Sequence, residues 1–275
     1  MKRASLRYQL PLFVALAGLT VVNLIPVIWA LLISLKQPVD AFAVPPSLIF
    51  EPTLEFHYEI WFERGLLGYL VNSLIISAGT VVVSVTCGTL AAYGLTRIRA
   101  GRVQAILIGL MAVRMIPHLL LAIPFFVLAR YFGLIDTHFV MILALVAINQ
   151  PFTIWLMKGF FDDVPKELYE AATVDGCSIW QAFYKVALPV VRPGIWVAAL
   201  FSFLLSYNEF LLALVLTGPN SKTLPVAISE YGAEDITYWS LSAAGSIGII
   251  LPVLLFMGVL QRQLVRGFAA GAVKG

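Results

Sequence analysis

Polar and ionisable side chains interrupt the long apolar stretches of this chain, and their role there is the first question that the sequence raises. Six of them fall well inside such stretches: Arg114, His118, Asn149, Tyr207, Asn208 and Glu209. Because an ionisable side chain inside a bilayer is costly, each is a candidate functional residue lining a polar path. The alternative is a structural role in hydrogen bonds between helices, with Glu209 neutralising Arg114.

The spacing of these residues allows them to share one cavity. Arg114 and His118 are four residues apart, which places them on one face of a helix. At a rise of about 1.5 Å per residue, both lie at a depth similar to those of Asn149 and Asn208. For the two asparagines we favour a place along the path. For Arg114 and Glu209, the path and a structural role between helices both stay open. Asn208 and Glu209 are about 100° apart on a helix, so we expect one to face the path and the other a neighbouring helix.

The sequence holds no pattern typical of an enzyme or a metal site. No group of His and Cys has metal-ligand spacing, and the phosphate-binding pattern G-x-x-x-x-G-K-[ST] is missing. Cys87 falls in an apolar stretch and Cys177 in a polar one, which argues against a disulfide. We therefore expect no catalytic residue, no metal and no bound cofactor in this chain.

Composition indicates a membrane protein. The chain is 60% hydrophobic and 12% charged, with a mean hydropathy of +0.93. A bilayer crossing needs about 20 apolar helical residues. The sequence predicts an all-α membrane protein, one domain over residues 1–275, with six transmembrane helices at approximately 10–35, 66–96, 103–129, 137–158, 193–216 and 238–261. The first stretch is longer than a signal peptide and has no cleavage site after it, so we expect an uncleaved span.

Basic residues predict the orientation of these spans, because cytoplasmic loops are rich in Lys and Arg. One set of loops contains thirteen of them: Lys2, Arg3, Arg7, Arg97, Arg99, Arg102, Lys158, Lys166, Lys185, Arg192, Arg262, Arg266 and Lys274. The opposite set contains four: Lys36, Arg64, Arg130 and Lys222. Both termini and the polar segment after the fourth span are therefore predicted to be cytoplasmic, in a plasma or inner membrane.

The polar segment, residues 162–190, is predicted to fold as a helix-turn-helix outside the membrane. Pro165 suits the first position of a helix. Gly176 suits the left-handed position that ends one.

A second short helix is expected after this turn. Ser178 followed by Gln181 is a capping-box pattern, and Pro189 is expected to break the helix. Its aromatic residues fall near one face: Trp180, Phe183 and Tyr184. The segment is either a connector resting on the membrane surface or a docking element for a soluble cytoplasmic partner.

Glu-Ala-Ala, followed after three residues by Gly and later by Leu-Pro, resembles the EAA motif of ABC importer permeases. The matching residues are Glu170, Ala171, Ala172, Asp175, Gly176, Leu188 and Pro189. The stretches "NSLIISAGTVVVSVTCGTLAAYGLTR", "YNEFLLALVLT" and "QRQLVRGFAAGAVKG" resemble the carbohydrate-uptake branch, which includes the second permease of the maltose importer. The likeness covers nearly the whole chain. Cys177 departs from the pattern, because the family usually has alanine there.

The resemblance implies a permease subunit that passes a sugar or polyol across the membrane by alternating access. The motif residues would couple it to a separate ATPase, which would bind ATP and Mg. The implied partners are a second homologous permease, two copies of the ATPase and an extracytoplasmic solute-binding protein. The C-terminal tail would reach toward the ATPase, and its glycines predict a poor helix and a flexible extension.

Two other functions compete with this interpretation. A stand-alone secondary transporter or channel would move solute without ATP, but it leaves the cytoplasmic helix pair unexplained. A membrane scaffold without a transport role leaves the buried polar residues unexplained. The sequence does not name the solute.

Overall fold

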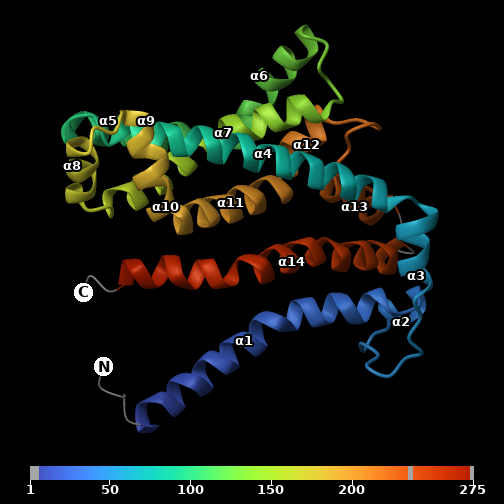
Figure 1. Cartoon of the computed structure of the whole chain (residues 1–275). Helices are drawn as coiled ribbons and strands as arrows, with labels where there is room; N and C mark the ends of the chain where they lie inside the picture. Colours follow the sequence, from blue (N-terminus) through green and yellow to red (C-terminus); the bar gives the residue numbers. More distant parts are fainter. Residues whose placement is uncertain (1–5, 235–237, 273–275) are drawn as a thin grey trace. The chain divides into compact units, whose positions relative to one another are not determined.

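The computed structural model describes residues 6–234 and 238–272, with side chains placed for residues 10–231 and 238–261. All regular elements in these ranges are helices (Figure 1). The chain divides into two compact units. One unit comprises Met1–Leu67 and Ala227–Leu251, and the other comprises Gly68–Val226 and Pro252–Gly275.

Four described helices are long and apolar enough to cross a membrane: α1 (Leu6–Ser34), α4 (Leu66–Leu95), α7 (His138–Asp162) and α14 (Trp239–Ala272). Two bent pairs raise the number to as many as six if each pair is one span. The first joins α5 (Ala100–Arg114) to α6 (His118–Tyr131) at 85°, and the second joins Ile179–Val190 to α11 (Arg192–Tyr207) at 75°.

The third and fifth expected spans are therefore not continuous helices. The stretch 103–129 breaks between Arg114 and His118, where Pro117 has no N–H to donate and disfavours a helical conformation at the residue before it. The stretch 193–216 breaks after Tyr207, and α12 (Leu211–Leu216) follows.

The second unit has buried clusters on the faces of α7. One cluster joins α7 to α4 and α11 through residues such as Val85, Met157 and Ala198. Another joins α7 to α6 and α12 through residues such as Ala122 and Leu212. A smaller one joins α7 to α5 through Ile154 and Val103. α8, α9 and α10 gather at the end of this unit where α5 begins (Figure 1).

Small residues let α4 and α7 approach each other closely. A Cβ on Gly88 would lie 2.6 Å from Cγ2 of Thr153, so only glycine fits there. The hydroxyl groups of Ser84 and Thr153 are 3.1 Å apart and buried. Close approach and a buried hydroxyl pair are typical of helix packing in membranes.

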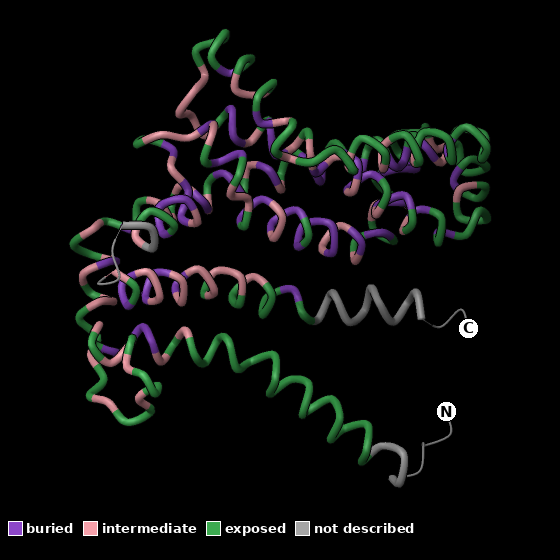
Figure 2. The backbone as a smooth tube through the Cα atoms, turned by 180° about the vertical axis from the view of Figure 1, so that it is seen from behind, coloured by how far each residue is buried: buried purple, intermediate pink, exposed green. Residues whose placement is uncertain are grey.

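The first unit contains α1, most of α13 (Leu224–Glu234), the N-terminal part of α14 and a loop with α2 (Pro38–Ala41), α3 (Glu55–Tyr58) and the π-helix η1 (Glu59–Glu63). Lys36 organises the loop, because its Nζ donates to the carbonyl of Ser47 at 2.5 Å and lies near the rings of Trp29 and Phe50. By contrast, α1 is exposed along almost its whole described length (Figure 2).

The C-terminal tail differs from the sequence expectation. α14 continues as a helix to Ala272, whereas the tail glycines predicted a flexible extension. Each interior glycine costs about 1 kcal/mol relative to alanine, which is too little to stop a long helix that is already nucleated. Residues 273–275 lie outside the described chain.

Candidate functional site

The first helix of the polar segment is α8 (Lys166–Val174), and its ends are set by local sequence. Pro165 was expected at the first position of this helix but is the N-cap residue just before it. Gly176 has a φ of +75° and donates its N–H to the carbonyl of Thr173, while Cys177 donates to Ala172. This pair of hydrogen bonds is the Schellman motif, which favours glycine at the left-handed position.

The second helix starts as the sequence predicted but does not end where it was expected to. Ser178 and Gln181 form the complete capping box at the start of α9 (Ile179–Ala182). The chain then widens into the π-helix η2 (Phe183–Ala187) and continues through α10 (Leu188–Val190). Pro189 therefore does not break the helix. It is the second residue of α10, and the break comes at Val191.

An aromatic cluster fixes this segment to the end of α4. The ring of Tyr93 lies 5.6 Å from that of Phe161, 6.4 Å from that of Tyr169 and 4.8 Å from that of Phe183. Its hydroxyl donates to the carbonyl of Ile179 at 3.2 Å. Arg97 donates to the same hydroxyl at 2.6 Å. Rings and hydrogen bonds together hold α8 and α9 on the spans.

The opposite side of the segment is open. Of the motif residues, Glu170, Ala171, Asp175, Gly176 and Pro189 are exposed, Leu188 is half-buried and Ala172 is buried. The expected aromatic face divides, because Phe183 is buried whereas Trp180 and Tyr184 are about 60% exposed. Six large apolar side chains of the polar segment are exposed: Leu168, Val174, Ile179, Trp180, Tyr184 and Val190. A polar segment with this much exposed apolar surface is typical of a docking site.

Within the spans, the structure pairs Glu209 with His118 rather than with Arg114. Oε2 of Glu209 lies 3.1 Å from Nδ1 of His118, and its Oε1 accepts from the N–H of Leu212 at 3.2 Å. The expected Arg114–Glu209 pair is therefore wrong in this structure. The two breaks explain the change, because His118 begins α6 and Glu209 precedes α12.

The other expected path residues have different surroundings. Asn149 is buried, and no described residue hydrogen-bonds its Nδ2. Tyr207 is buried and stacks on Phe203 with ring centroids 5.3 Å apart, which makes it part of the packing. Asn208 is exposed and donates to the carbonyl of Leu204 in α11 at 2.9 Å. Because α11 ends before Asn208 and Glu209, the helical angle expected between them does not apply.

Arg114 lies half-buried at the end of α5. Its guanidinium is 4.4 Å from the ring centroid of Phe152 on α7. Its Nη1 is buried without a hydrogen-bond partner among the described residues.

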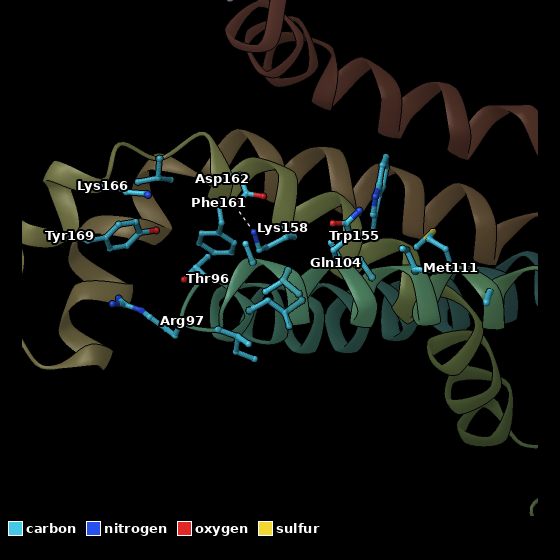
Figure 3. Close-up of a pocket in the computed structure, with 18 of the residues that line it drawn as sticks. Thr96, Arg97, Gln104, Met111, Trp155, Lys158, Phe161, Asp162, Lys166 and Tyr169 are labelled. Atoms are coloured by element: carbon cyan, nitrogen blue, oxygen red, sulfur yellow. Dashed lines mark hydrogen bonds and ion pairs between the residues drawn. The ribbon is translucent and has the colours of Figure 1, made fainter.

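An open groove of about 1060 Å³ runs along α5 and α7. Figure 3 shows Arg97, Lys166 and Tyr169 toward one end and Trp155 and Met111 toward the other. Lys158, buried in the groove wall, forms an ion pair with Asp162. The groove therefore connects the polar segment with the middle of the spans.

Comparison with known proteins identifies the family. Residues 84–269 match the family described as "Binding-protein-dependent transport system inner membrane component". The chain belongs to this family. It is 36% identical to the probable ABC transporter permease protein y4oR of Sinorhizobium fredii, over 93% of this chain and 92% of that protein. It is 34% identical to the trehalose transport system permease protein SugB of Mycobacterium tuberculosis, over 92% and 93%.

A solved structure has the same fold as this permease. It is the bacterial ABC transporter "involved in the import of the acidic polysaccharide alginate", with a TM-score of 0.73 and 21% identity over 95% of this chain and 98% of that chain. The family match and the sequence relatives confirm the resemblance to permeases of the carbohydrate-uptake type.

The structure of the permease also reveals residues that sequence reasoning missed. In the sequence, Tyr93 falls in an expected span and Arg97 in a basic loop, and the only signal for their role is an aromatic and a basic residue beside a helix end.

Asp136 was missed as well. This residue, with a φ of 60°, accepts hydrogen bonds from the N–H groups of Gly218, Asn220 and Ser221 and from two side chains. Burial opposes ionisation, but the Ser221 hydroxyl and these N–H groups outweigh it and lower the pKa of Asp136 to about 2.

Proposed function

We propose that this permease passes a sugar or polyol across the membrane by alternating access, driven by ATP hydrolysis on a separate ATPase. The solute would come from an extracytoplasmic binding protein. The names of its relatives support a carbohydrate, because SugB is named for trehalose and the structural neighbour imports alginate. Membership of this transporter family disfavours the stand-alone transporter and the scaffold.

The permease acts in this proposal with a second homologous permease and two copies of the ATPase. ATP and Mg²⁺ bind to the ATPase, and this chain itself catalyses no reaction. The absence of a phosphate-binding pattern from the sequence supports this division of labour. Both termini and the polar segment lie in the cytoplasm, which the distribution of Lys and Arg supports.

One observation carries the coupling role: the polar segment is fixed on one side and open on the other. Tyr93, Phe161 and Phe183 hold it to the spans, whereas Glu170 and Ala171 are exposed. Small exposed residues at Ala171 and Gly176 let another protein approach closely. We assign ATPase docking to Glu170, Ala171, Asp175, Gly176 and Pro189, and a supporting role to Ala172 and Leu188.

The solute path of this proposal passes the broken spans. The residues that face or adjoin this path are Asn149, Asn208 and Arg114. The His118–Glu209 pair connects the two broken spans beside it. Tyr207 supports the path by packing rather than by contact.

The substitution Ala171→Arg tests the coupling role. Ala171 is exposed, so a long side chain can be accommodated without disturbing the fold of the permease. It would block close approach of the ATPase. We expect co-purification of the ATPase with the permease to fall at least tenfold, together with ATP-dependent uptake.

The matched control is Gly101→Arg. Gly101 is also exposed, lies in the first turn of α5 in another cytoplasmic loop of the predicted topology, and has open space where a Cβ would lie. This variant should retain the ATPase and the rate of uptake within twofold of the unmodified permease. Equal ATPase recovery for Ala171→Arg and Gly101→Arg would contradict the docking role.

A further inference from the structure

The groove along α5 and α7 changes in character along its length. At the end that the proposed orientation places in the cytoplasm, Arg97 and Lys166 are exposed and Lys158 is buried in the wall. Figure 3 shows Arg97 and Lys166 at this end, apart from the apolar end. Farther along the groove the large side chains are apolar: Leu107, Ile108, Met111, Met115 and Trp155. A molecule that fits the whole groove is therefore charged at one end and apolar along the rest.

The acids at the charged end do not oppose an anionic ligand. Two acids line this end of the groove, Asp162 and Glu170. Asp162 forms an ion pair with Lys158, so its charge is already balanced. Glu170 belongs to the docking face that we assign to the ATPase. The basic groups of the groove mouth therefore remain for a ligand.

These basic groups are placed to bind an anion. The guanidinium carbon of Arg97 lies 5.1 Å from the ring centroid of Tyr93 and 5.2 Å from that of Tyr169, which fixes the side chain between two rings. The described hydrogen bond of this guanidinium, to the Tyr93 hydroxyl, uses one of its five N–H donors. Lys166 is exposed at the start of α8, and the α4–α5 loop at 97–102 contains two more arginines.

The apolar part of the groove matches one leaflet of a bilayer in length. The lining residues of α5 include Ala100 and Ala112, which are about 18 Å apart at a rise of 1.5 Å per residue. One leaflet contributes about half of a hydrocarbon core of roughly 30 Å. Sugar hydroxyls need hydrogen-bond partners, and the large side chains from Leu107 onward offer almost none. The groove therefore suits an acyl chain better than the solute.

We propose that this groove binds an anionic glycerophospholipid of the inner leaflet. Its phosphate lies at Arg97 and Lys166, and one acyl chain follows Ile108, Met111 and Trp155. Basic pockets between helices on the cytoplasmic side are typical sites for anionic lipid headgroups. A hollow of about 1060 Å³ with charge at one end distinguishes this place from the ordinary lipid-facing surface of a span. The inference goes beyond the proposed function, because this ligand is not transported.

Native mass spectrometry of the complete importer complex tests the site. The delipidated complex in detergent is titrated with palmitoyl-oleoyl phosphatidylglycerol, with the corresponding phosphatidylcholine and with dihexanoyl phosphatidylglycerol. Phosphatidylglycerol should bind at least tenfold more tightly than phosphatidylcholine, which has the same chains but no net charge. The dihexanoyl lipid should bind at least tenfold more weakly than the long-chain phosphatidylglycerol, because its chains are too short to fill the apolar part.

Two variants with matched controls assign the binding to the groove. Lys166→Gln should lower the affinity for phosphatidylglycerol about fivefold, as expected for one basic residue near an anionic lipid. Lys185→Gln removes the same charge from an exposed position of the polar segment outside the groove, and should keep the affinity within twofold. Ala112→Trp should fill the apolar part and lower the affinity at least tenfold. Its control is Val113→Trp, at an exposed position of α5 that does not line the groove.

Three results would overturn the inference. Equal affinities for phosphatidylglycerol and phosphatidylcholine would do so, and so would equal effects of a variant and its control. Loss of the complex in Ala112→Trp but not in Val113→Trp would show that the second permease covers the groove instead of a lipid. None of these measurements uses transport, so failure of the lipid site leaves the proposed function standing, and failure of ATP-dependent uptake leaves the lipid site standing.

Discussion

At the scale of single residues, Glu209 joins two interrupted helices. Its carboxylate meets His118 at the start of α6 and also accepts the N–H of Leu212 at the start of α12. Each break leaves backbone groups without helical partners, and in a membrane such groups need partners within the protein. One side chain therefore satisfies a helix start and bridges to the other broken span.

Glu209→Ala should destabilise the permease more than Asn208→Ala. The first removes an acceptor from α12 and leaves His118 without its partner, a loss of about 1 to 3 kcal/mol. The second removes only a hydrogen bond from the Asn208 side chain to the carbonyl of Leu204 in the preceding helix, α11. The measurement is the thermal unfolding midpoint of the purified complex in detergent.

Glu209→Gln refines this prediction. Glutamine can still accept the N–H of Leu212 but carries no charge, so its midpoint should fall between those of Glu209→Ala and the unmodified permease. Equal midpoints for the alanine variants at 208 and 209 would show that Glu209 does not hold the breaks together. For Asn208→Ala we expect normal assembly and weaker uptake.

At the scale of elements, Asp136 connects the α6–α7 turn to the loop between α12 and α13. It accepts N–H groups from Gly218 and Ser221, and its own N–H donates to the carbonyl of Leu216 at 3.0 Å. A loop that would otherwise be free is thereby attached to two helix ends. Asn220 and the Ser221 hydroxyl complete the set of donors.

This attachment predicts a dependence on pH. The pKa of Asp136 is lowered from 3.8 to about 2, so its stabilisation is present above pH 3.8 and is lost as the pH falls toward 2. Asp136→Asn tolerates the positive φ but loses the charge. At pH 7 we expect the variant to lose about 1 to 2 kcal/mol in free energy of unfolding and to unfold at a lower midpoint. The difference in midpoint between the variant and the unmodified permease should shrink between pH 4 and pH 2. A difference that grows on acidification would contradict this assignment.

At the scale of the whole molecule, the asymmetry of Lys and Arg predicts the topology. Thirteen basic residues fall in one set of loops and four in the other. The two cysteines are free, with Cys87 in α4 and Cys177 in the turn between α8 and α9. The two cysteines can report the topology, because only Cys177 lies in a segment predicted to be outside the spans.

A membrane-impermeant maleimide should therefore label Cys177 in inside-out vesicles but not in intact cells. The Cys87→Ser variant should behave in the same way, and Cys177→Ser should lose the signal. Labelling of Cys177 in intact cells would reverse the proposed orientation.

Periodicity and turn chemistry predicted much of this fold, because those signals are local. The four long helices follow from apolar length, and the capping box at Ser178 and the left-handed Gly176 follow from residue type. The bend between α5 and α6 has a local signal in Pro117, which the expectation of one continuous span overlooked, whereas no local pattern predicts the wide turn before Pro189. The partner of Glu209 could not be predicted either, since His118 and Arg114 are one turn apart and only the break decides between them.

The ring cluster around Tyr93 restrains the polar segment against the end of α4. A flexible linker would absorb a displacement by rotating its own backbone. Close-packed aromatic rings, with centroids 4.8 to 6.4 Å apart, transmit the displacement instead. Displacement of Trp180 would then arrive at the end of α4 nearly undiminished, as in a stiff lever. The movement of the proposed ATPase would then set how far the spans move. Smaller side chains at these ring positions would let the ATPase hydrolyse ATP without moving the spans.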